Sequence, residues 1–356
     1  MLGFALPLLV YSFVFVLHLL LPARTVDGYV IDPATLRPLR YRLNGLVVFI
    51  VTIALYVLAA HRGLIAWDLF WTYRWQMAAG ACVLGLVFTL SIVLPAPARG
   101  SLGADLYLGR VDNPQWLGGR VDAKMFLYLV GAVMLELNVL SFAAHHVLAH
   151  PGDPSRGVLL YAVMFSFFLA EYLTFEEVHL YTYDFFAERV GFKLGWGCLV
   201  FYPFFYCVGL WATAARPNPH TSPALLALAV VCFFGGWMLS RGANLQKYLF
   251  KTAPERSLFG ILTPVAVSGG GKQLLCSGFW RLSRHINYLG EILMAVGLTL
   301  ALGWPRLPLP WLYPLYYVVL LLPRQHFDDQ RCAAKYGALW IEYCRRVPYR
   351  IIPFIY

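Results

Sequence analysis

Nine long apolar runs divide the chain, and short polar segments separate them. Most are close to the roughly 20 residues that a helix needs to cross the hydrocarbon core of a bilayer. Lipid offers no hydrogen-bond partner to open backbone groups, so helices are the expected spanning form. The pattern predicts an all-α, polytopic membrane protein with about nine to ten transmembrane helices. The runs lie at about 1–21, 43–60, 76–95, 125–148, 157–180, 191–215, 223–243, 286–303 and 307–322.

The last two runs are short, and the Pro-rich turn WPRLPLP joins them, so a count of eight or ten spans also remains open. Composition agrees with a membrane protein, since 60% of the residues are hydrophobic and only 13% are charged. A soluble domain of 356 residues cannot remove so much apolar surface from water. We therefore expect one integral membrane domain over residues 1–356.

The basic residues alternate between connections, which predicts the orientation of the chain. Segments 22–42, 96–124 and 241–284 are rich in Lys and Arg, whereas two intervening connections carry only Arg156 and Arg216. By the positive-inside rule, the N-terminus lies outside the cytoplasm and the C-terminal tail lies inside. The host membrane stays open between a bacterial inner membrane and the endoplasmic reticulum.

The net charge of +10 fits this topology and attraction to anionic lipid. No basic domain stands apart from the spans, so we expect no nucleic-acid partner. The seven cysteines form no CxxC pair, and we expect reduced structural cysteines and no metal site.

One polar group begins the run at 286–303, where residues 283–291 read SRHINYLGE. On a helix, Arg284, Asn287, Tyr288 and Glu291 share one face. A plain helix start with Ser283 as its cap is one interpretation. The other is a pocket wall, because this face combines a cation, an amide, a phenol and a carboxylate. Glu291 is then either a partner of Arg284 or part of the acid machinery.

Two further polar groups are basic and lie at the cytoplasmic side. The segment after the last run presents Arg324, Asp328, Arg331 and Lys335 on one helix face, and ANLQKYLFK closes an earlier span. A solvated face and snorkelling lysines are the ordinary interpretations. Polar faces at one membrane depth also build a pocket, and its Arg and Lys content suits a phosphorylated anion.

The fourth group is FFLAEYLTFEEVHLYTYD at 167–184, which places carboxylates at the edge of a span. Tyr172, Glu176, His179 and Tyr183 follow helical spacing, and Glu171 lies deepest. Such carboxylates are costly in a membrane and usually mark function. A buried carboxylic acid has a raised pKa and can donate a proton near neutral pH.

Several of these stretches carry a family resemblance. SGFWRLSRHINYLGE and DDQRCAAKYGALWIEYCRRVPYRIIPFIY closely resemble the C-terminus of the sterol reductases. That family includes the Δ14- and Δ7-sterol reductases, the fungal Δ24(28) enzyme and the membrane domain of the lamin B receptor. Four earlier segments also resemble family motifs: GYVIDPATLRPLRYRLNGL (28–46), GRVDNP (109–114), FEEVHLYTYD and ANLQKYLFK.

The resemblance implies a ten-span helical fold, NADPH as the hydride donor and a sterol double bond as the acceptor. Residues 1–220 would then supply spans with part of the substrate pocket, and residues 221–356 would bind the cofactor. Lys247 and Lys251 would meet the NADPH phosphates, and Asp328 and Tyr343 would fall nearest the nicotinamide. The same pocket would contain Asn244, Trp280, Arg284, His285, Asn287, Tyr288, Arg324, Arg331, Lys335 and Tyr336.

The implied chemistry is protonation of the alkene followed by hydride transfer to the resulting cation. The candidate acids are Asp328, Glu171 and Glu176, with Tyr172 or Tyr343 as a relay. Departures from the family motifs include Phe175 for its Asn and Glu171 for its Asp. They fall in the expected substrate half, so they leave the cofactor assignment standing and leave the reduced bond open. The Δ14 bond is the first expectation, and Δ7 and side-chain bonds are the alternatives. The sterol would enter from the bilayer, with membrane lipids as neighbours.

Two other classes compete with this interpretation. Isoprenylcysteine carboxyl methyltransferases share part of the tail pattern and use S-adenosylmethionine, but they lack the RLNG, N-P and QKxxF segments found here. A non-enzymatic sterol-binding scaffold, by analogy with the lamin B receptor, is the third interpretation.

Overall fold

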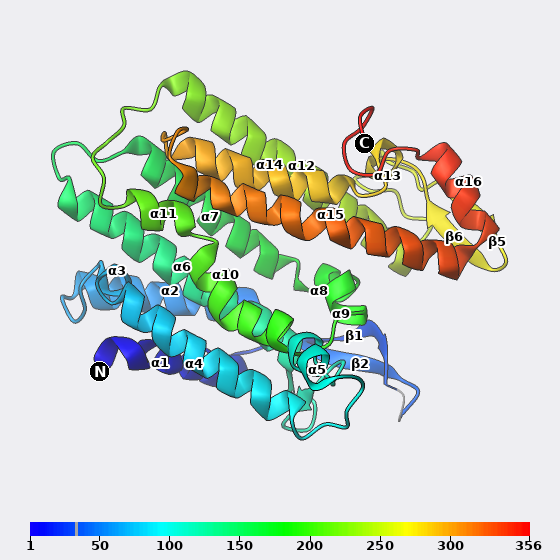
Figure 1. The fold of residues 1–356 in the computed structure, drawn as a ribbon, viewed down its shortest axis with the longest axis horizontal. Coiled ribbons are helices and arrows are strands. Elements are labelled where there is room, and N and C mark those ends of the chain that lie inside the picture. The colour runs from blue at the N-terminus through cyan, green and yellow to red at the C-terminus, as the bar shows by residue number, and fades with distance from the viewer. Residues whose placement is uncertain (33–34) are drawn as a thin grey trace. The chain divides into compact units, whose positions relative to one another are not determined.

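The computed structural model describes residues 1–32 and 35–356; the two residues between them belong to the segment 28–46. The chain folds into two compact units, Met1–Asn218 and Pro219–Tyr356 (Figure 1). Each unit has its own helices and its own polar groups, and we describe each by itself.

Unit 1, Met1–Asn218, is built around α6, which packs against α1, α2, α7 and α10. α6 is the most buried of the helices that could span a membrane. The longer helices are α1 (Leu2–Leu20), α2 (Gly45–His61), α4 (Arg74–Val93), α6 (Ala123–Ala149) and α7 (Arg156–Thr174). The shorter ones are α3 (Leu69–Thr72), α5 (Leu102–Leu108), α8 (Glu176–His179), α9 (Tyr183–Phe186), α10 (Tyr202–Phe205) and α11 (Val208–Thr213).

The run predicted at 191–215 is helical but is not one regular α-helix. It begins as a π-helix, η1 (Phe192–Phe201), and continues through α10 and α11. The Tyr11 hydroxyl of α1 donates to the backbone oxygen of Leu199. Gly131 of α6 permits close approach, because a Cβ there would lie 2.7 Å from the Cys198 oxygen.

Two short antiparallel hairpins in unit 1 were not expected from the hydrophobic pattern. They pair β1 (Arg24–Ile31) with β2 (Pro38–Leu43), and β3 (Gln115–Trp116) with β4 (Val121–Asp122). In β2, the Arg42 side chain donates to the backbone oxygens of His18 and Leu21, at 3.1 and 2.6 Å. The RLNG segment thereby supplies partners to open carbonyls at the end of α1.

The GRVDNP segment has a similar structural role. Arg110 Nε lies 2.7 Å from Asp105 Oδ2, and Arg110 Nη1 donates to the Ala96 oxygen at 2.8 Å. Gly109 has φ +93° and packs on the backbone of Val190, where a Cβ would lie 2.4 Å from the carbonyl carbon. The segment therefore joins the chain after α4, α5 and the start of η1.

Unit 2, Pro219–Tyr356, is dominated by the close pairing of α12 (Pro223–Thr252) and α14 (Ile286–Ala301). Glycines make this approach possible, because a Cβ on Gly236 or Gly290 would lie 2.5 Å from the other's backbone oxygen. α15 (Pro308–Tyr336) packs against α14. The smaller elements are β5 (Ala266–Gly269), β6 (Lys272–Leu275), α13 (Phe279–Leu282) and α16 (Ala338–Arg346).

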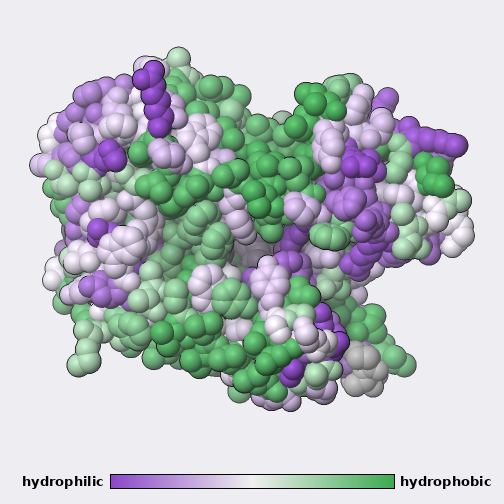
Figure 2. All heavy atoms as spheres, viewed as in Figure 1, coloured by the Kyte–Doolittle hydropathy of each residue, from purple (hydrophilic) through white to green (hydrophobic). Residues whose placement is uncertain are grey.

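All nine predicted apolar runs are largely helical in the described residues. Six described helical segments are long and apolar enough to cross a membrane, and α2 and α14 are shorter apolar helices. Large apolar side chains such as Leu8, Leu9 and Phe13 are exposed along α1, and Figure 2 shows broad hydrophobic surface. The chain is a helical integral membrane protein, while the count of nine to ten spans stays a prediction.

Two boundary predictions were wrong. The run at 157–180 was expected to be one helix, but α7 ends at Thr174 and α8 starts separately at Glu176. The basic segment after the last run is not a separate helix, because α15 continues from Pro308 to Tyr336 with Pro323 inside it.

Candidate functional site

In unit 2, the first of the polar groups predicted from sequence lies at the end of α12. Trp280 of α13 donates from Nε1 to the Ala243 oxygen at 2.8 Å, and Lys247 Nζ lies 5.7 Å from the Trp280 ring centroid. The buried Gln246 holds α13 in place, because its Oε1 accepts from the Phe279 N–H at 3.0 Å. A cation and an indole are thus fixed on one side of this helix end.

The two basic segments predicted from sequence come together in unit 2. Lys247 interacts electrostatically with Asp328 and Lys335, and Lys251 interacts with Lys247 and Lys335. Lys335 Nζ also lies 5.2 Å from the ring centroid of Tyr336. Three ammonium groups near one carboxylate leave a net positive charge, which suits a phosphorylated ligand.

The start of α14 differs from its prediction. The helix begins at Ile286, so Arg284 does not continue the face of Asn287 and Tyr288. The Arg284 and His285 N–H groups donate to the backbone oxygens of residues 349 and 350, at 2.9 and 2.8 Å. Ser283 is no helix cap either, because its hydroxyl donates to the Ile351 oxygen at 2.8 Å. These contacts hold the backbone of residues 283–285 in a non-helical conformation just before α14.

Asp329 is a central residue that the sequence analysis missed. Its carboxylate lies 3.3 Å from Arg284 Nη1, 3.6 Å from Arg350 Nε and 3.8 Å from His285 Nε2. Gln325 Nε2 donates to it at 2.8 Å. Burial opposes ionisation, but His285 and the two guanidinium groups outweigh it and hold the pKa of Asp329 below its ordinary value. The sequence pattern predicted the neighbouring Asp328 instead, because Asp328 shares a helix face with Arg324 and Lys335.

Three buried polar atoms at the start of α14 have no hydrogen-bond partner in the described structure: Arg284 Nε, His285 Nε2 and Asn287 Oδ1. Buried polar atoms are normally paired, so unpaired ones suggest a missing ligand or water. Asn287 Nδ2 is engaged, because it donates to Asn244 Oδ1 at 3.3 Å. Asn244 and Lys247 both belong to α12, and nitrogen and oxygen atoms of this kind fit a ligand that carries phosphate and hydroxyl groups, as NADPH does.

Two other residues predicted for this pocket, Tyr288 and Glu291, contact neighbouring side chains. Tyr288 stacks on His285 with ring centroids 4.8 Å apart. Ser240 donates to Glu291 Oε1 at 2.6 Å, whereas Arg284 pairs with Asp329, so Glu291 is not the partner of Arg284.

The remaining residues predicted to line the cofactor pocket of unit 2 differ in their exposure to solvent. Arg324 is half-buried and Arg331 is exposed on α15. Tyr343 is buried in an apolar cluster and stacks on Trp340 at 5.1 Å, and burial raises the pKa of its phenol. These surroundings give Tyr343 a packing role.

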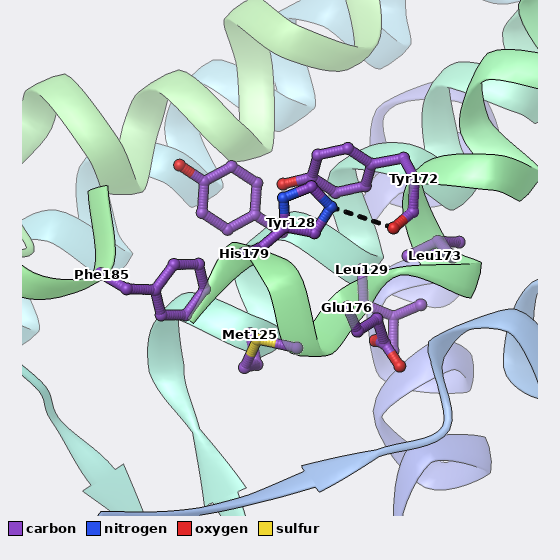
Figure 3. Close-up of a pocket in the computed structure, with 8 residues that line it drawn as sticks. All are labelled: Met125, Tyr128, Leu129, Tyr172, Leu173, Glu176, His179 and Phe185. Atoms are coloured by element: carbon purple, nitrogen blue, oxygen red, sulfur yellow. Dashed lines mark hydrogen bonds between the residues drawn. The ribbon is translucent and has the colours of Figure 1, made fainter. Parts of the chain in front are cut away.

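Unit 1 contains a small pocket with an acid in its wall (Figure 3). Its empty volume is about 200 Å³, including its open mouth. Glu176 Oε2 accepts a hydrogen bond from the Gly45 N–H at 3.0 Å. Burial raises the pKa of Glu176 to about 7, although the Gly45 N–H and the Arg24 charge oppose the shift. The lining residues are Met125, Tyr128, Leu129, Tyr172, Leu173, Glu176, His179 and Phe185.

The predicted stripe of Tyr172, Glu176, His179 and Tyr183 is not one helix, but its first three members meet in this pocket. The His179 and Tyr172 rings stack with centroids 3.9 Å apart. His179 Nε2 lies 3.0 Å from the Tyr172 backbone oxygen (Figure 3). Glu171 is also buried, although it does not line the pocket.

A further buried acid in unit 1, Glu136, was missed. It lies in the middle of α6, is only 2% exposed, and accepts a hydrogen bond from Ser166 of α7 at 2.5 Å. Its other oxygen, Oε2, has no hydrogen-bond partner in the described structure. A single carboxylate inside the apolar run MLELNVL was the available signal, since such residues are rare in spans.

Comparison with known proteins identifies the family. The chain is 32% identical to the Δ14-sterol reductase of Arabidopsis thaliana, over 98% of this chain and 95% of that protein. It is 35% identical to the Δ14-sterol reductase TM7SF2 of Mus musculus, over 95% and 82% of the two chains. For the Δ14-sterol reductase of Saccharomyces cerevisiae the identity is 28%, over 97% and 82%. The model of the ergosterol biosynthesis ERG4/ERG24 family matches residues 2–356, and the chain belongs to that family.

Proposed function

We propose that this protein is an NADPH-dependent reductase of the Δ14 double bond of a sterol. The observation that carries the proposal is similarity to several Δ14-sterol reductases over almost the whole chain. The family makes the chain an oxidoreductase that acts on a carbon–carbon bond of sterols. It also favours this function over the methyltransferase and the non-enzymatic scaffold.

The cofactor would bind to unit 2. Lys247, Lys251 and Lys335 would hold its phosphates, because their positive charges interact with one another. The unpaired atoms of Arg284, His285 and Asn287 would complete the contacts. NADPH, when bound, supplies the hydride. The remaining proposed contacts are Asn244, Trp280, Tyr288, Arg324, Asp328, Arg331 and Tyr336.

Glu176 is the proposed proton donor. With a pKa of about 7, its carboxyl group keeps its proton in much of the protein at neutral pH and releases it readily. Transfer of that proton to one alkene carbon breaks the π bond and leaves a cation on the other carbon. The rings of Tyr128, Tyr172 and Phe185 line the same pocket and would stabilise that positive charge.

The other candidate donors are Glu171 and Asp328, with Tyr172 or Tyr343 as a relay. Glu171 is buried but does not line the pocket, and Tyr343 packs in an apolar cluster. These positions support Glu176 ahead of them. Separate substitutions distinguish the five residues, because only loss of the true donor removes turnover while NADPH still binds.

The sterol would reach the protein from the bilayer, with membrane lipids as neighbours. The proposed topology has nine to ten spans, with the C-terminal tail on the cytoplasmic side. It applies equally to a bacterial inner membrane and to the endoplasmic reticulum.

A direct assay tests the function. Purified protein in nanodiscs is incubated with NADPH and Δ14-, Δ7- or side-chain-unsaturated sterols, and products are identified by mass spectrometry. We expect NADPH oxidation and a product two mass units heavier with the Δ14 sterol. Absence of NADPH oxidation with every sterol, together with tight binding of S-adenosylmethionine, would overturn the proposal.

A further inference from the structure

The pocket and the Glu136–Ser166 pair lie on the same two helix faces. On α6, Leu129 lines the pocket and Glu136 follows seven residues later; on α7, Leu173 lines the pocket and Ser166 precedes it by seven. Seven residues are close to two full helical turns, so each helix returns to nearly the same face. The hydrogen bond between Ser166 and Glu136 shows that these faces meet. Pocket and pair are therefore two points along the α6–α7 contact.

The distance between these two points follows from helix geometry. At 1.5 Å per residue, seven residues correspond to roughly 10 Å along the helices. The turn between them carries Ala132 and Val133 on α6 and Leu169 and Ala170 on α7. Val133 and Leu169 are fully buried, whereas Ala170, like Ser166, is half-buried, so the more accessible edge of this stretch carries the short side chains of Ser166 and Ala170.

The Glu136 carboxyl group has an unused hydrogen-bonding position. One oxygen accepts from Ser166, and Oε2 is buried without a hydrogen-bond partner in the described residues. Ser166 itself is half-buried, so the carboxyl group lies behind a partly accessible side chain. A hydroxyl group suits this position in either protonation state of the acid, because it can both donate and accept.

The chemistry of a sterol matches these two points. A sterol carries one hydroxyl group on ring A, and a Δ14 bond belongs to ring D at the other end of the fused nucleus. The rigid nucleus has about the length of the separation, whereas a Δ7 bond in ring B lies nearer to the hydroxyl group. A hydroxyl anchor at one point and an acid at the other would distinguish these bonds.

We propose that Glu136 and Ser166 bind the ring-A hydroxyl group of the substrate, and that their separation from Glu176 selects the Δ14 bond. The inference rests on the proposed sterol reductase function and names the orientation of its substrate. The nucleus would lie along the α6–α7 contact, with ring D at the pocket that Glu176 lines.

The test measures two substrates with the wild-type protein and with each variant, and compares the ratio of their kcat/KM values. kcat/KM is measured for a Δ14 sterol and for its 3-methyl ether, which cannot donate a hydrogen bond. Wild-type protein should prefer the free sterol by about 10- to 100-fold, the usual effect of leaving a buried polar group without its partner. Glu136→Leu should bring this ratio to within about twofold of one, and Glu136→Gln should retain most of it.

The matched control is Glu291→Leu, which removes a Ser–Glu hydrogen bond of the same kind in unit 2, between Ser240 and the half-buried Glu291. It should leave the ratio between sterol and ether unchanged, whatever it does to turnover. Glu136→Leu should also lower the preference for Δ14 over Δ7 sterols by at least about tenfold. Should Glu136→Leu fail to fold, Ser166→Ala serves instead and should lower the ether discrimination at least threefold.

Two failures are distinguishable. An unchanged ratio in Glu136→Leu, in a folded protein that still reduces the sterol, overturns the anchor and leaves the reductase function intact. Wild-type protein that reduces no sterol overturns the reductase function itself.

Discussion

Two carboxyl groups, one buried in unit 1 and one half-buried in unit 2, have opposite electrostatic surroundings. Glu176 in unit 1 receives one backbone N–H from Gly45, and burial raises its pKa to about 7. Asp329 in unit 2 is half-buried, and burial opposes its ionisation too, but Arg284, His285 and Arg350 surround it and its pKa is lowered. Burial alone therefore does not decide whether an acid keeps its proton; the neighbouring cations decide.

The difference separates two roles. An acid that retains its proton near neutral pH is able to donate it, so Glu176 suits catalysis. An acid that stays ionised holds cations in place, so Asp329 suits the organisation of the residues that begin α14 and of the C-terminal segment. The predictions that follow test this division, beginning with the largest effect.

Replacing Glu176 by Gln should lower kcat by about 10²- to 10⁴-fold, because the amide has no acidic proton to transfer. NADPH binding, measured by fluorescence titration, should not change. Glu177→Gln is the matched control, because Glu177 is the adjacent acid and pairs with Arg24. Equal activity of Glu176→Gln and wild type would assign the proton to another group.

The same variant should change the pH dependence of stability. Between its ordinary pKa of 4.5 and about 7, Glu176 keeps in the folded state a proton that the unfolded chain has released. The free energy of unfolding therefore falls as pH rises across this window, by about 3 kcal/mol in total. Thermal melts in detergent should show a smaller fall for Glu176→Gln, and identical pH profiles would contradict the raised pKa.

Replacing Asp329 by Asn should destabilise unit 2 by about 1–3 kcal/mol, because it leaves the buried Arg284 and His285 without a carboxylate, while solvent screens the more exposed Arg350. The lowered pKa means that this stabilisation is present above the ordinary pKa of Asp and is lost as the pH falls through the folded value. Thermal melts at several pH values measure it. The exposed pair of Glu342 with Arg346 is the control, and Glu342→Gln should change little.

Replacing Lys247 by Ala should raise the KM for NADPH by about 10- to 100-fold, the expected effect of losing a charge-assisted contact to phosphate. The change in kcat should be smaller, because the contact serves binding. Lys193→Ala is the control, since Lys193 pairs with Glu188 in unit 1. An unchanged KM would remove Lys247 from the phosphate site.

Replacing Tyr343 by Phe should have the smallest effect, with kcat and KM within about twofold of wild type. The ring packs in an apolar cluster with Val267 and Val347, and Phe preserves that packing. Steady-state kinetics of Tyr343→Phe and wild type measure both values. A large loss of kcat with unchanged stability would make the Tyr343 phenol part of proton transfer.

Much of the fold was predictable because membrane spans are long and their hydrophobic signal is strong. All nine apolar runs are largely helical, and the lysines of α12 and α15 gather in unit 2. The break after Thr174 was not predictable, because the spacing of Tyr172, Glu176 and His179 fits an unbroken helix equally well. Glu136 was overlooked although one acid in an apolar run was visible, because no motif included it.

The amino-acid sequence by itself determined that the chain is a helical membrane protein, that its tail is basic, and which motifs carry the chemistry. Composition, charge and local periodicity are properties of short segments and need no knowledge of distant contacts. Only the tertiary structure decided that Asp329 holds Arg284, that Gly45 contacts Glu176, and that Ser166 meets Glu136. These pairs are 45, 131 and 30 residues apart in sequence, and folding alone brings such distant side chains together.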